Sequence, residues 1–340
     1  MIKSNTPSFE WGIELTPDVP ASDVAELGTV VESTGFDVAF GSCHYNNRDP
    51  FVALDRLAAA TDEIRLGPGV ANPYDVHPVR LASLVATLSE VSNGRTVLGL
   101  GAGDPSTLRN LGLEWDRPLT RVRETMRVHR RLWAGERVDH DGTFQVNDAG
   151  LNYEADQVPV FVGAQGPRMI QMAAENADGV LVNASHPDDY AWAAEQVNSG
   201  LDSRADSRDA FTFAAFASVS VDTDASAAEN AARPPVAFIA AGAPEEVIER
   251  HGLDAGRTEE IGAAISAGEF DRAYDLVTAN MLDTFCIAGT PSSVADRIAS
   301  IREYTDAFVA ASPLGPDRKE AIELLGEVRE RLSTRGPTDD

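Results

Sequence analysis

Short apolar runs alternate with amphipathic segments along most of the chain. The runs predict eight buried strands, at residues 11–15, 36–42, 64–70, 95–103, 158–163, 178–184, 211–221 and 307–312. Between them, apolar positions recur at helical spacing, for example from Ser22 to Thr34 before Gly35, and from Pro78 to an Asn93-Gly94 turn. Nearly continuous apolar strands separated by amphipathic helices predict a parallel sheet covered by helices.

Eight such units favour an α/β fold that closes into a single (β/α)8 TIM barrel. An open doubly wound sheet is the alternative, and it is disfavoured because no G-x-G-x-x-G pattern follows the first strand. Residues 223–290 are too long for one crossover and contain several short helical patterns, which predicts a helical insertion before the last strand. We therefore expect one domain over residues 1–340, with a frayed tail at residues 333–340.

The charge balance narrows the classes of partner. The chain has 54 acidic and 28 basic residues, a formal net charge of −26, and its only lysines are Lys3 and Lys319. Nucleic acid is therefore not an expected partner. Many acids with almost no lysine indicate a protein of a halophilic, salt-rich cytosol, where screening suppresses self-repulsion. An ordinary acidic cytosolic enzyme is the alternative.

Several other classes of protein lack support in the sequence. No apolar stretch is long enough to span a bilayer and the first residues do not form a signal peptide, so we expect a cytoplasmic protein without a membrane partner. Cys43 and Cys286 make no disulfide framework and no zinc spacing. No paired metal-ligand motif and no G-x-S-x-G elbow is present, so we expect no metal.

Unusual residues collect where the predicted strands end, and in a barrel the carboxyl ends carry the chemistry. The first strand ends near Glu14, the second is followed by His44, and the fourth ends near Asp104. In "GAQGPRM" the Gly166-Pro167 pair predicts a helix start whose free amides, at residues 168–170, would face a phosphate beside the Arg168 guanidinium. The segment "LGPDRK" near the C-terminus resembles this arrangement.

Seven motifs occur in the order of a known family: "HYNNRDP", "LGPGVANPY", "HPVRLASLVATLSEVSNGR", "LGAGD", "VFVGAQGP", "ADGVLVNAS" and "ASPLGP". They resemble the coenzyme F420-dependent 5,10-methylenetetrahydromethanopterin reductases of archaea, within the bacterial-luciferase-like superfamily. The resemblance extends from about Trp11 to Leu325. It implies a luciferase-like barrel, reduced coenzyme F420 (a deazaflavin) as hydride donor, and a homodimer or homotetramer.

The resemblance also implies site residues. It places a non-prolyl cis peptide at Gly69-Val70, behind the deazaflavin ring. The implied cofactor-binding residues are Cys43, His44, Gly69, Val70, Asn72, Ala102, Gly103, Asp104, Thr107, Gly163, Gly166, Pro167 and Arg168. The implied substrate-binding residues are Asn47, Arg48, Gln165 and Asn183. The family has an aspartate at the position of Cys43.

The reaction implied is hydride transfer to the methylene carbon of a reduced pterin, with one acid to protonate N10. We expect Glu14 to be that acid, with Asp104 as the competitor. The substrate is 5,10-methylenetetrahydromethanopterin or 5,10-methylenetetrahydrofolate, and a halophilic source favours the folate. Two alternatives stay open: an FMN-dependent luciferase-like monooxygenase and a non-catalytic deazaflavin-binding protein.

Overall fold

The computed structural model describes residues 9–205 and 211–334. All eight expected strands are present, as β1 (Glu10–Leu15), β2 (Val38–Gly41), β3 (Arg65–Pro68), β4 (Leu98–Leu100), β7 (Val160–Ala164), β8 (Gly179–Asn183), β9 (Thr212–Val221) and β11 (Ala307–Leu314). Their order in the sheet is β3-β2-β1-β11-β9-β8-β7-β4. Bridges from Leu66 to Thr96 and from Ala71 to Leu100 connect β3 to β4. The expected TIM barrel is thereby confirmed, nearly closed and parallel.

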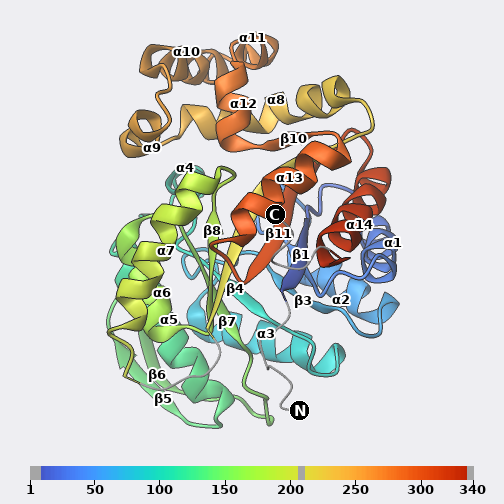
Figure 1. Cartoon of the computed structure of the whole chain (residues 1–340). Coiled ribbons are helices and arrows are strands. Elements are labelled where there is room, and N and C mark those ends of the chain that lie inside the picture. Colours follow the sequence, from blue (N-terminus) through green and yellow to red (C-terminus); the bar gives the residue numbers. More distant parts are fainter. Residues whose placement is uncertain (1–8, 206–210, 335–340) are drawn as a thin grey trace. The chain divides into compact units, whose positions relative to one another are not determined.

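Helices follow the strands as the apolar spacing predicts. The helices that alternate with the strands are α1 (Ala21–Ser33), α2 (Pro50–Ala60), α3 (Pro78–Val91), α4 (Pro105–Asn110), α5 (Pro118–Trp133), α6 (Pro167–Asn176), α7 (Pro187–Leu201), α13 (Pro291–Arg302) and α14 (Arg318–Thr334). Figure 1 shows α1 and α2 side by side next to β1 to β3. They approach closely because Gly28 of α1 has no side chain, and a Cβ there would lie 2.8 Å from Leu57 Cγ.

The chain divides into two compact units. The first comprises residues 1–182, 194–215 and 305–309, and it contains β1 to β4, β7 and most of β8. The second comprises residues 183–193, 216–304 and 310–340. The boundary between the two units falls inside the strands β8, β9 and β11. This division differs from the expected single domain over residues 1–340, and the single domain stays a prediction.

The expected helical insertion lies in the second unit. Its helices are α8 (Ala225–Ala241), α9 (Glu245–Arg250), α10 (Ala255–Ser266), α11 (Phe270–Asp275) and α12 (Ala279–Phe285). Figure 1 shows them grouped together, in yellow to orange. They share an apolar core in which Val236, Ile261 and Met281 are fully buried. The insertion is thus packed around its own core.

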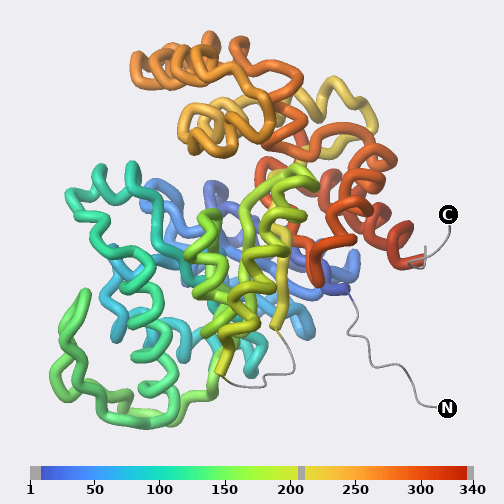
Figure 2. Tube along the Cα trace, turned by 60° about the vertical axis from the view of Figure 1, so that its left-hand side comes forward, coloured from blue at the N-terminus to red at the C-terminus, as the bar shows by residue number. Residues whose placement is uncertain are grey.

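Three strands were not predicted. The strands β5 (Val138–Asp141) and β6 (Gln145–Ala149) form an antiparallel hairpin after α5, which Figure 2 shows in green. Their sequences, VDHD and QVNDA, are mostly polar and give no strand signal. The strand β10 (Ile287–Gly289) pairs in parallel with β9 and is only three residues long.

The helix α14 continues to Thr334, so the frayed tail expected from residue 333 is wrong for Ser333 and Thr334. The rest of that predicted tail, residues 335–340, lies outside the described residues. Across the described ranges, no helix is both long and apolar enough to cross a bilayer.

Candidate active site

Most of the expected site residues lie at the carboxyl ends of β1, β2, β3, β4 and β7, all in the first unit. These strands run parallel, so their carboxyl ends share one edge of the barrel. The ends of β3 and β4 are joined directly, because Gly101 N donates a hydrogen bond of 2.8 Å to Ala71 O. The structure therefore brings the side chains from these strand ends to one edge.

The Gly69-Val70 peptide is cis, as the resemblance implies. The Val70 side chain packs against glycines of neighbouring strands. A Cβ at Gly101 would lie 2.4 Å from Val70 Cγ2, and a Cβ at Gly163 would lie 3.1 Å from Val70 Cγ1. The glycines therefore leave the space that Val70 fills, and Val70 with these glycines forms a wall where the ends of β3, β4 and β7 meet.

Asn72 follows this wall and is 7% exposed. Its Oδ1 accepts hydrogen bonds from Tyr74 N (3.0 Å) and Asp75 N (3.1 Å), and its Nδ2 donates to Asp75 Oδ2 at 3.1 Å. Gly103, on the β4 side, has φ of +71° and lies against the Asn72 side chain. Asn72 thus spans the ends of two adjacent strands.

At the end of β2, Cys43 and His44 have different surroundings. Burial raises the pKa of the Cys43 thiol, and the nearby carboxylates of Asp75, Asp49 and Glu14 add to the effect, so the thiol stays neutral. His44 is exposed, and its ring makes no hydrogen bond to a described residue. It is therefore free to contact a ligand.

The expected substrate residues Asn47 and Arg48 lie in the same loop. Asn47 N donates to His44 O at 3.0 Å, which closes a turn. The Arg48 guanidinium donates to Asp18 O at 2.6 Å. Arg48 thereby fixes the β2 loop to the segment that follows β1.

The two candidate acids differ in what surrounds them. Glu14 is 7% exposed on β1, and Thr16 Oγ1 donates to its Oε1 at 3.0 Å. Asp104 is exposed and caps α4, where its Oδ1 accepts from Thr107 N at 2.8 Å and from the Ser106 hydroxyl.

The pKa of Asp104 reflects this capping role. Partial burial on its own would raise the pKa, but the hydrogen bonds from Ser106 and Thr107 outweigh it and lower the pKa. Asp104 therefore stays ionised as a helix cap and is poorly suited to donate a proton. Thr107 is one of the residues expected to contact the cofactor, and its backbone amide is used in the same cap.

The start of α6 agrees only in part with the expected anion site. The helix begins at Pro167 after an extended Gly166, and residues 165–168 are all exposed. Of the three amides expected to be free, those of Met169 and Ile170 donate to Gly166 O. That expectation is corrected: only the Arg168 amide has no acceptor within the part of the chain that the structure describes.

The similar segment near the C-terminus, in the second unit, is not such a site. The helix α14 begins at Arg318 and not at Pro316, and the Asp317 carboxylate accepts from Glu320 N at 2.9 Å. A carboxylate already occupies the place of an anion there. Asn183, the fourth expected substrate residue, ends β8, is exposed and belongs to this second unit.

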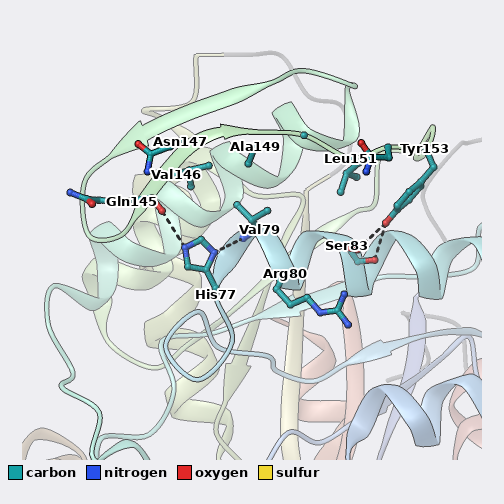
Figure 3. A pocket seen from close by; sticks show the side chains of 12 residues that line it. His77, Val79, Arg80, Ser83, Gln145, Val146, Asn147, Ala149, Leu151 and Tyr153 are labelled. Atoms are coloured by element: carbon teal, nitrogen blue, oxygen red, sulfur yellow. Dashed lines mark hydrogen bonds between the residues drawn. The ribbon is translucent and has the colours of Figure 1, made fainter.

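A cavity of about 580 Å³ lies elsewhere in the first unit, between α3 and the β5–β6 hairpin. Figure 3 shows how its polar groups are paired: Val79 N donates to His77 Nδ1, His77 Nε2 donates to Gln145 O at 3.2 Å, and Ser83 bonds to the Tyr153 hydroxyl. The bond from His77 to Gln145 attaches the hairpin to the start of α3, and the bond between Ser83 and Tyr153 attaches the segment after β6 to the same helix. None of the lining residues belongs to the strand-end set.

The family model described as luciferase-like monooxygenase matches residues 3–307. The chain is 44% identical to the 5,10-methylenetetrahydromethanopterin reductase of Archaeoglobus fulgidus over 94% of this chain and 98% of that protein. It is 40% identical to the enzyme of the same name from Methanolobus tindarius, over 93% and 98% of the two chains.

Among solved structures, the coenzyme F420-dependent tetrahydromethanopterin reductase from Methanopyrus kandleri superposes with a TM-score of 0.89 at 37% identity, covering 94% of this chain and 98% of that one. The barrel and its strand-end site thus define a luciferase-like protein. The chain belongs to the luciferase-like monooxygenase family and, within it, to the branch of the archaeal 5,10-methylenetetrahydromethanopterin reductases.

Sequence reasoning missed several residues at the strand ends. Asp75 holds Asn72, Trp115 Nε1 donates to Ala102 O at 2.9 Å, and Asn110 Nδ2 donates to the Tyr45 hydroxyl at 3.2 Å. The Asn72-Pro-Tyr-Asp75 segment carried one usable signal, because asparagine followed by proline is typical of a turn closed by the asparagine side chain. The contacts of Trp115 and Tyr45 had no signal in the local sequence.

Proposed function

We propose that the chain is an F420-dependent oxidoreductase, acting on a CH-NH group, that reduces a 5,10-methylene reduced pterin to the 5-methyl form. The substrate class is 5,10-methylenetetrahydromethanopterin or 5,10-methylenetetrahydrofolate. When bound, the reduced deazaflavin supplies the hydride that the methylene carbon accepts. The chain's own residues then have to hold two flat rings, keep water away and deliver one proton to N10.

The observation that carries this proposal is the wall at Val70. A tricyclic ring needs a surface free of long side chains, and we propose that the half-buried Val70, packed against the glycines at positions 101 and 163, supplies it. His44 and the second N–H of the Asn72 amide are polar groups with no partner in the described part of the chain. They fit a polar edge of the ring.

The start of α6 supports a phosphate contact. Gly166 has open space where a Cβ would be, the Arg168 amide is free of protein acceptors, and the Arg168 side chain is exposed. In a chain of net charge −26, a bound phosphate needs such local donors. Ala102, Gly103, Pro167 and Gln165 complete the proposed surroundings of the cofactor and substrate.

Glu14 is the proposed acid. It is almost fully buried at the carboxyl end of β1. Asp104, in contrast, is ionised and engaged as a cap. Of the two candidates, only Glu14 has a carboxylate that is not engaged as a helix cap, so we assign the general-acid role to Glu14.

The deciding experiment follows oxidation of reduced F420 under anaerobic conditions, with each methylene pterin in turn. We expect loss of reduced F420 and formation of the 5-methyl product with at least one of them. F420 binding without turnover would instead support a non-catalytic deazaflavin-binding protein. A purified protein that carries flavin and consumes oxygen would support an FMN-dependent monooxygenase.

A further inference from the structure

The orientation of the Asn72 amide is fixed from both sides. Its oxygen accepts from two backbone amides, Tyr74 N and Asp75 N, and its nitrogen donates to Asp75 Oδ2. If the amide were flipped, its NH2 group would face two N–H donors and its oxygen would face a carboxylate. The observed arrangement therefore leaves one N–H as the only unused donor of the Asn72 side chain within the described contacts.

The loop that carries Asn72 is itself held in place. Arg121 Nε donates to Pro73 O at 2.9 Å, and the Arg121 guanidinium lies 4.4 Å from the centre of the Tyr74 ring. The Tyr74 hydroxyl donates to Asp116 O at 2.6 Å. On its other side, Asn72 lies against Gly103, where a Cβ would come within 3.2 Å of Asn72 Cγ.

We propose that Asp75 is a positioning residue of the cofactor site, whose carboxylate orients the Asn72 amide so that its remaining N–H is presented to the bound deazaflavin. This inference rests on the proposed function. Asp75 acts through Asn72, and its role is distinct from the negative charge it adds beside Cys43.

Asp49 offers a matched control for charge. Like Asp75, it is a carboxylate near Cys43, and burial together with these two charges raises the pKa of that thiol. Asp49 caps α2 through Phe51 N and Val52 N, and within the described residues it has no hydrogen bond to the Asn72 side chain. Asp49→Asn removes the same charge from the same neighbourhood and keeps an oxygen that can cap the helix.

The test measures F420 affinity by fluorescence titration of the full chain in high salt. We expect Asp75→Ala and Asn72→Ala each to weaken binding about fivefold to tenfold, the effect of one lost hydrogen bond. Asp75→Asn, whose amide oxygen can still accept from Asn72, should bind within about twofold of wild type, as should Asp49→Asn. The double variant Asn72→Ala/Asp75→Ala should be no weaker than Asn72→Ala alone.

Several outcomes would overturn the assignment. Wild-type affinity in Asp75→Ala, or effects that multiply in the double variant, would show that Asp75 does not act through Asn72. Equal losses in Asp75→Asn, Asp75→Ala and Asp49→Asn would show that charge alone matters. A wild-type chain that does not bind F420 would overturn the proposed function, and this inference with it, whereas intact wild-type binding confines any failure to Asp75.

Discussion

The fit between Val70 and the strand-end glycines gives a quantitative prediction. In Gly101→Ala the new Cβ would lie 2.4 Å from Val70 Cγ2, more than 1 Å inside a normal carbon–carbon contact of about 3.5 Å. Val70 also lies close to β7, since a Cβ added at Gly163 would be 3.1 Å from Val70 Cγ1. Overpacking of this kind costs about 2 kcal/mol of unfolding free energy.

The second half of the prediction is rescue. Val70→Ala removes the methyl groups that clash, and alone it should cost about 1 kcal/mol because Val70 is only partly buried. The double variant Gly101→Ala/Val70→Ala should then also cost about 1 kcal/mol, against about 3 kcal/mol if the two effects added. Gly163→Ala, with a closest contact of 3.1 Å, should cost less than Gly101→Ala.

The assay is equilibrium unfolding by urea at constant high salt, monitored by tryptophan fluorescence. Gly150→Ala is the control for adding a methyl group, since its closest neighbour, Arg137 Cγ, would be at an ordinary 3.5 Å. That control should stay within about 0.5 kcal/mol of wild type. Additive costs in the double variant, or a Gly101→Ala protein as stable as wild type, would refute the packing described at Val70.

Four further results are expected. Glu14→Gln should lower turnover about 100-fold or more, with F420 affinity nearly unchanged. Glu10→Gln, at the other end of the same strand, is the control and should keep wild-type turnover. Equal rates in the two variants would exclude Glu14 as the acid. Arg168→Ala should weaken F420 binding far more than it lowers the melting temperature, and unchanged affinity would remove the phosphate contact. Burial lowers the pKa of His129 to about 4, below its unfolded value of about 6.5. The unfolded chain therefore binds the proton more readily, and the free energy of unfolding should fall by up to about 1.4 kcal/mol per pH unit as the pH drops from 6.5 to 4. Urea titrations of His129→Gln should show a shallower dependence of stability on pH. Folding and activity should require molar salt, because at 50 mM salt the screening length is about 14 Å and the acidic residues repel one another. Full stability in 50 mM salt would contradict a halophilic origin.

The sequence by itself determined the architecture. Eight apolar runs and the helices between them set the barrel, because each run is long enough to carry its own periodic signal. The same local signals located Glu14, His44 and Arg168 at strand ends, and the motif resemblance located the cis peptide at Gly69-Val70. Where the signal was weak, as in the polar β5–β6 hairpin and the three-residue β10, the strands were missed.

Tertiary structure decided which of these residues can act and how. The sequence favours Glu14 over Asp104 as the acid only by its position at the end of the first strand, and only the folded chain shows Asp104 engaged as a helix cap and Glu14 almost fully buried. The side chain that fills the space beside Gly101 is that of Val70, which follows β3. Contacts of this kind join residues that are far apart in the chain, so no local pattern can encode them, and they exist only after the strands have closed into the barrel.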